Sequence, residues 1–104
     1  MTYIDEAGLQ VRQVLRPGVP IPPEQKLLYQ LYGLLMLTRG EDCTSKDVHD
    51  AWAVWAAQSR SDDPFLIPFE ELPEEVQKLD NRYAAAIRMA AKQNKIHEEK
   101  QCQI

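Results

Sequence analysis

The sequence predicts an all-α fold: a compact bundle of four principal helices, with a proline-rich connector and an irregular strap before the last helix. The helix formers Ala, Leu, Glu, Gln and Lys dominate, and no stretch alternates apolar and polar residues between turn signals. Apolar residues recur at helical spacing in segments bounded by capping residues, glycine or proline. The 104 residues are expected to form one domain with one hydrophobic core.

The first half of the chain predicts two helices joined by a stiff connector. The first helix spans about Thr2–Leu15, with Thr2 as its N-cap. The stretch "RPGVPIPP" then fixes an extended path, because proline removes backbone donors. The second helix spans about Pro23–Arg39 and ends at Gly40, which suits a left-handed cap. Its expected apolar face comprises Leu27, Leu28, Leu31, Tyr32, Leu34 and Leu35.

The second half predicts a capped third helix and a long fourth one. The third helix begins at Thr44, whose hydroxyl is placed to accept from the Asp47 amide. The fourth begins near Leu72 and Pro73, and a polar extension over about residues 92–104 is expected to protrude or fray. Its expected buried stripe comprises Val76, Leu79, Tyr83, Ile87 and Ala90.

The segment "FLIPF" between these helices is expected to act as a buried strap. Leu66 and Phe69 are predicted to enter the core, and Pro68 to fix the turn. The strap and the last helix are predicted to enclose the indole of Trp52.

Composition narrows the functional classes. A net charge of −4 and a pI near 5.1 disfavour nucleic-acid binding, since phosphate attraction needs a basic surface. Two cysteines without an export signal are typical of reduced thiols, and no apolar run is long enough to cross a bilayer. We therefore expect a soluble cytoplasmic protein.

The residues that carry chemistry do not form a recognisable catalytic or metal pattern. The two histidines and two cysteines lack the spacing of a zinc site. Cys43 and His49 are close enough to pair, but an ordinary loop cysteine beside a partly exposed histidine is the preferred interpretation. The glycines are isolated, so no phosphate loop is expected. The sequence predicts no enzyme, no metal and no cofactor.

Eight residues are predicted to form a ligand- or partner-binding site. The third helix contributes His49, Trp52 and Trp55, while Arg82 is expected to meet an anionic group. The preferred interpretation of these residues is nevertheless structural: core packing for Trp52, and an Asp80–Arg82 or Arg82–His49 contact that holds the third and fourth helices together. The eight residues are His49, Trp52, Trp55, Phe65, Pro68, Phe69, Asp80 and Arg82.

Two motifs within residues 48–88 carry a family resemblance: "VHDAW" and, after a loop, "PFLIPFEELPEEVQKLDNRYAAAIR". Together they resemble the ryanodine-receptor repeat (RyR) domain, although "AAQSRSDDPF" replaces that family's Gly-Trp-x-Tyr-Gly and Lys-x-His-Pro stretches, and Asn81 is extra. The resemblance implies a helical, non-catalytic module that binds ligands or partner proteins. The whole chain is also similar to small proteins of actinobacteria and their phages. The matching positions are His49, Trp52, Leu66, Ile67, Pro68, Phe69, Leu72, Lys78, Asp80 and Arg82.

Three functions follow as predictions. The first is a non-enzymatic protein-interaction module, encoded by a phage and acting on a host protein. The second is a small-ligand sensor for a nucleotide-like molecule. The third, a helix-turn-helix DNA regulator, is disfavoured because Asp47 and Asp50 occupy the first turns of the recognition helix. Homodimerisation through the first or fourth helix is left open.

Overall fold

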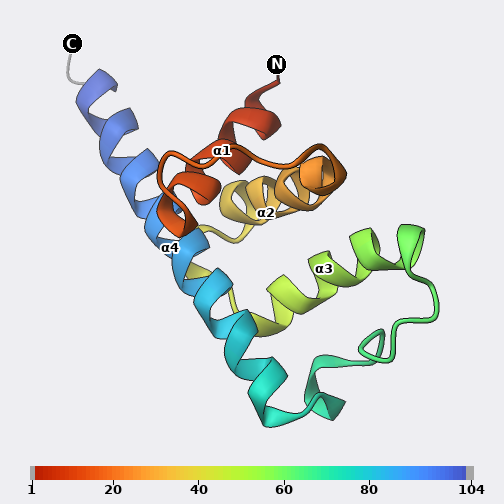
Figure 1. Cartoon of the computed structure of the whole chain (residues 1–104). Helices are drawn as coiled ribbons and strands as arrows, with labels where there is room; N and C mark the ends of the chain where they lie inside the picture. The colour runs from red at the N-terminus through yellow and green to blue at the C-terminus, as the bar shows by residue number, and fades with distance from the viewer. Residues whose placement is uncertain (1, 103–104) are drawn as a thin grey trace.

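The computed structural model describes the backbone of residues 2–102 and the side chains of residues 2–95. Within residues 2–102 the fold is an all-α bundle without strands, as predicted. Figure 1 shows α4 running along one side of the molecule, α1 and α2 packed together against it, and α3 extending away from it. The helices are α1 (Tyr3–Leu15), α2 (Lys26–Thr38), α3 (Ser45–Ser59) and α4 (Glu74–Cys102), with 3₁₀ turns η1 (Pro23–Gln25), η2 (Gly40–Asp42) and η3 (Phe69–Glu71).

Local capping sets where α1 and α3 begin. The Thr2 hydroxyl accepts from the Asp5 amide at 3.2 Å, and the Asp5 carboxylate accepts from the Thr2 amide at 3.0 Å. Thr44 and Asp47 form the same reciprocal pair at the start of α3. These capping boxes satisfy amides that lack a helical partner, and both predicted N-caps are confirmed. Gly40 has φ +57°, the left-handed conformation expected after α2.

The close approach of α1 and α2 depends on two glycines. A Cβ added to Gly33 would lie 2.6 Å from the Gly8 nitrogen, and one added to Gly8 would lie 2.5 Å from the Tyr29 carbonyl oxygen. Neither distance leaves room for a side chain, so the two backbones meet directly. The crossing brings α1 against the face of α2 that carries Tyr29, Gly33 and Met36.

This crossing explains one error in the expected core. Tyr29 and Met36 are buried on α2, whereas Leu34 is exposed, because the face toward α1 is rotated from the leucine-rich stripe. On α4, Leu79 is 59% exposed, although the sequence predicts its burial. Leu79 lies in the first turns of α4, where it lines an open pocket between this helix, α2 and α3. The core cluster comprises Ala7, Val11, Leu28, Tyr29, Tyr32, Met36, Cys43, Val48, Ala51, Ala84, Ile87 and Ala90.

A buried arginine anchors the proline-rich connector. The Arg12 side chain donates to the carbonyl oxygens of Val19 at 3.2 Å and Pro20 at 3.1 Å, and to the Tyr29 hydroxyl at 2.8 Å. The planar guanidinium supplies several donors in fixed directions, which suits a connector whose prolines cannot donate. The connector is therefore held against α1 and α2.

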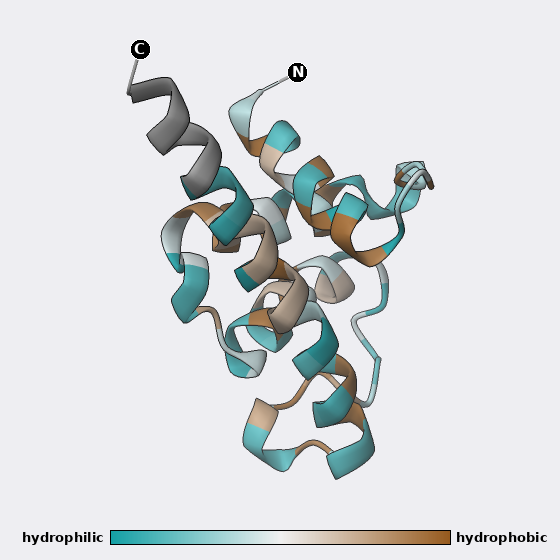
Figure 2. Cartoon of the chain, turned by 90° about the vertical axis from the view of Figure 1, so that its left-hand side faces the viewer, coloured by the Kyte–Doolittle hydropathy of each residue, from teal (hydrophilic) through white to brown (hydrophobic). Residues whose placement is uncertain are grey.

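The strap (residues 60–73, between α3 and α4) is less buried than expected. Leu66 and Phe69 are half-buried at the edge of the bundle, and Leu72 is the buried strap residue. Pro68 is exposed and precedes η3. The Gln77 amide donates to the carbonyl oxygens of Phe69 at 3.0 Å and Leu72 at 3.2 Å, which ties the strap to α4. Figure 2 shows hydrophilic and hydrophobic residues along the strap, which runs to the lower end of the molecule.

Two further predictions have definite outcomes. Trp52 is half-buried rather than enclosed, because its indole packs against the core on one side and lines an open pocket on the other. The predicted polar extension continues α4 as helix to Cys102, so the backbone does not fray at residue 92. The side chains of residues 96–104, including Cys102, lie outside the described residues.

Candidate binding groove

A groove of about 300 Å³ lies where α2, α3, the strap and the start of α4 meet. Five of the eight predicted site residues line it: His49, Trp52, Trp55, Phe65 and Asp80. The other lining residues are Gln25, Leu28, Tyr32, Arg60, Val76, Leu79 and Tyr83. Most of the lining side chains are apolar or aromatic, and they surround one carboxylate.

The spacing along α3 brings three of the predicted residues to one face. His49, Trp52 and Trp55 are three residues apart, so successive rings lie on the same side of the helix. The His49 and Trp52 rings are stacked, with centroids 5.5 Å apart and planes 24° apart. Trp55 donates from its indole nitrogen to the Glu24 carbonyl oxygen at 3.0 Å, which fixes the ring against η1. The Arg60 guanidinium lies 4.9 Å above the Trp55 ring.

His49 connects α3 to the strap. Its side chain is 3% exposed, and its Nε2 lies 2.6 Å from the carbonyl oxygen of Ile67. A carbonyl oxygen only accepts, so Nε2 carries the proton and donates. The Phe69 ring lies 6.3 Å away and completes the enclosure of the imidazole. This hydrogen bond helps to hold the strap against α3, although most strap side chains are only half-buried or exposed.

Asp80 faces the other imidazole nitrogen without bonding to it. Its Oδ2 lies 3.8 Å from Nδ1 of His49, beyond hydrogen-bond distance. The Asp80 side chain is 15% exposed, and Oδ2 is inaccessible to solvent and has no hydrogen-bond partner among the described residues. Burial raises the pKa of this carboxyl, and the nearby imidazole opposes that rise in part. A carboxylate thus lies in the groove with little to compensate its loss of hydration.

Arg82 does not join this arrangement. It is exposed and lines two other depressions with residues of α1, including Leu15, while Asp80 lines the groove. Residues two apart on a helix point in nearly opposite directions, so Asp80 and Arg82 diverge. The expected contact of Arg82 with Asp80 or His49 is therefore wrong, and His49 and Asp80 face each other across the junction of α3 and α4.

The two remaining predicted residues, Pro68 and Phe69, lie on the strap and are not among the lining residues of the groove. The Phe69 ring packs near His49, whereas Pro68 is exposed. Sequence reasoning missed Tyr32 and Tyr83 as lining residues, because their helical spacing predicts core positions. It also missed Arg60, for which the sequence contains no signal.

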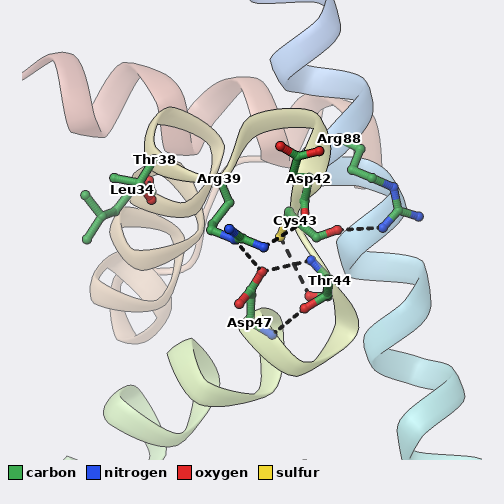
Figure 3. Close-up of polar contacts among 8 residues, drawn as sticks. All are labelled: Leu34, Thr38, Arg39, Asp42, Cys43, Thr44, Asp47 and Arg88. Atoms are coloured by element: carbon green, nitrogen blue, oxygen red, sulfur yellow. Dashed lines mark hydrogen bonds and ion pairs between the residues drawn. The ribbon is translucent and has the colours of Figure 1, made fainter.

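Cys43 has the environment of a structural thiol. Its side chain is buried, and burial raises the pKa of the thiol to about 11. Figure 3 shows the Cys43 carbonyl accepting from the Arg88 guanidinium, which links the turn before α3 to α4 at 2.8 Å. Among the described residues, no three His, Cys, Asp or Glu side chains are grouped to hold a metal ion.

The start of α3 is occupied by its own polar contacts. Asp47, which a recognition helix would present to DNA, caps α3 and accepts from the Arg39 guanidinium at 2.9 Å (Figure 3). Asp50 is exposed on the next turn. Negative side chains at these positions would repel phosphate.

Fold and groove together define a small all-α domain with an aromatic groove around a buried carboxylate. The chain belongs to the family described as a domain of unknown function (DUF7701), which matches residues 2–92. No curated protein and no solved structure matches the chain. The resemblance of residues 48–88 to the RyR domain stays a prediction. Within the described part of the chain, no helix combines the length and apolar character that a membrane crossing needs.

Proposed function

We propose that this domain is a non-enzymatic, cytoplasmic protein-interaction module whose groove receives a segment of a partner protein. The observation that carries the proposal is apolar surface left open at the groove. Leu79 is 59% and Phe65 is 38% exposed, and both line the same cavity. Exposed apolar side chains grouped in a concavity are typical of interaction sites.

The size and charge of the groove favour a partner segment over a nucleotide-like ligand. A volume of about 300 Å³ is at the lower end of small-molecule pockets, which span roughly 300–1,000 Å³. A nucleotide also needs a cation for its phosphates, but Arg60, the cationic residue that lines the groove, already lies over Trp55, and Asp80 contributes negative charge. One or two inserted side chains suit this space better. A phage origin and a host partner are further proposals, and they rest only on the resemblance to small proteins of actinobacteria and their phages.

Selection of short random peptides on the immobilised protein tests the proposal without knowledge of the partner. Both tryptophans of the chain line the groove, so their fluorescence reports on its occupancy. We expect selected peptides to change this fluorescence and to bind Leu79→Glu about tenfold more weakly or worse, since a central interface residue is altered.

Met89→Glu is the matched control, because Met89 is 54% exposed on the same helix but lines a different depression. Peptides should bind this variant as they bind the parent protein. If Leu79→Glu and Met89→Glu bind the selected peptides equally well, the groove is not the interface and the proposed function is wrong. Circular dichroism of both variants establishes that each remains folded.

A further inference from the structure

We propose that the groove selects a lysine or arginine side chain of the partner, which pairs with Asp80. This inference rests on the proposed function and names the chemistry that the groove recognises. Asp80 lines the groove with 15% of its side chain exposed, and its Oδ2, which faces His49, has no hydrogen bond among the described residues. A cation of the partner that approaches the exposed part of this side chain supplies a charged donor to the carboxylate.

The charges around Asp80 leave it available. His49 is the facing titratable group from α3, but its Nδ1 is 3.8 Å away, and its Nε2 proton is engaged by Ile67. Arg60 is the cationic residue that lines the groove, and its guanidinium lies over Trp55. Arg82 and Lys78 are each two residues from Asp80 in sequence, but Arg82 lines other depressions and Lys78 pairs with Glu74 at 3.7 Å. The carboxylate therefore lacks a close cationic partner within the described chain.

The walls of the groove suit the rest of a basic side chain. Lys and Arg bury their methylene stems against apolar surface while the charged head reaches a polar group. Trp52, Trp55, Tyr32 and Tyr83 offer aromatic surface of this kind around Asp80. Arg60 already places a guanidinium over Trp55, so this indole accepts a cation on its face.

Charge complementarity favours this occupant over the alternatives. An acidic segment or a phosphate would meet Asp80 directly, and the chain carries a net charge of −4. A purely apolar side chain would remove the remaining water from a carboxylate without offering a donor, which is costly. A lysine or arginine forms a charge-assisted hydrogen bond there, among the stronger contacts between proteins.

Peptides selected on the groove test this inference through a double-mutant cycle. We expect enrichment of Lys or Arg, and we expect the peptide's Lys→Met or Arg→Met version to bind roughly ten- to a hundredfold more weakly, the range for a hydrogen bond to a charged group. Asp80→Asn should weaken binding of the parent peptide similarly and should leave the Met peptide almost unaffected. Asp50→Asn, an exposed position on α3, is the control and should change neither.

The outcomes separate this inference from the proposed function. Peptides that bind at Leu79 and change the tryptophan signal, but that show no basic residue and no response to Asp80→Asn, would overturn the cation inference and leave the interaction module intact. Equal losses from Asp80→Asn for the basic and Met peptides would also overturn it, because the effect would then be structural. Absence of any peptide that senses Leu79→Glu contradicts the proposed function itself. A free alkylamine that binds as tightly as the peptides would replace the partner segment with a small amine.

Discussion

Replacing the Asp80 carboxylate by an amide should stabilise the free protein. The carboxylate is largely buried and its Oδ2 makes no hydrogen bond among the described residues. Asp80→Asn keeps the shape of the side chain but places a neutral amide, instead of a carboxylate, 3.8 Å from the His49 ring. The change therefore removes an uncompensated charge from a site with little hydration.

The magnitude follows from the burial of the group. An unsatisfied buried polar group costs about 1–3 kcal/mol, and the 15% exposure of the Asp80 side chain places its cost at the lower end. We expect Asp80→Asn to raise the free energy of unfolding by about 1 kcal/mol at pH 7, which corresponds to roughly 4 °C in Tm for a domain of this size. Urea and thermal unfolding followed by circular dichroism measure both quantities.

The pH dependence supplies a second check, with a definite sign. The pKa of Asp80 is raised in the folded state, so folded protein holds this proton more tightly than unfolded protein does. Protonation stabilises the fold below the unfolded pKa of about 4, and this contribution is lost as the pH rises through the raised pKa. The advantage of Asp80→Asn should therefore be small near pH 4 and largest near pH 7.

The comparison isolates Asp80 because its neighbours are unchanged. The parent protein and Asp80→Asn share the titratable or cationic residues that line the groove with position 80: Tyr32 on α2, His49 on α3, Arg60 after α3 and Tyr83 on α4. Asp50→Asn, at an exposed position, should change stability by no more than about 0.5 kcal/mol. If Asp80→Asn instead destabilises the protein at pH 7 by 1 kcal/mol or more, the carboxylate supports the fold, and the reasoning from an uncompensated charge is refuted.

Three further substitutions or reactions test other parts of the structure. His49→Phe keeps a ring beside Trp52 but leaves the Ile67 carbonyl without its donor. We expect the free energy of unfolding to fall by about 1–3 kcal/mol and amide hydrogen exchange in the strap to become faster. Unchanged exchange would contradict the contact between His49 and Ile67. Gly33→Ala should destabilise by about 1–3 kcal/mol despite its higher helix propensity, and increased stability in urea would contradict the close crossing of α1 and α2. Cys43, studied with Cys102→Ser, should react with iodoacetamide far more slowly in native than in denatured protein; equal rates would contradict its burial and its raised pKa of about 11.

Much of the fold is readable from the sequence because its signals are local. Thr2 and Thr44 each act on an amide three residues away, and Gly40 adopts the conformation that follows a helix end. His49, Trp52 and Trp55 share a face because helical geometry alone sets their directions. The positions of the helices along the chain, and the shared face of these three rings on α3, therefore follow from interactions that span only a few positions.

Burial and pairing depend instead on which faces meet. Leu79 is apolar and correctly spaced, but it is exposed because it lines the groove that α2, α3 and α4 leave open. Asp80 and Arg82 are near neighbours in sequence, yet only the position of α4 against α3 shows that one lines the groove and the other faces away. The orphaned Asp80 oxygen likewise has no counterpart in the sequence pattern, because hydration is lost only when separate helices come together. The sequence by itself determined the helices, their caps and the aromatic face, while the tertiary structure alone decided the groove and the uncompensated charge within it.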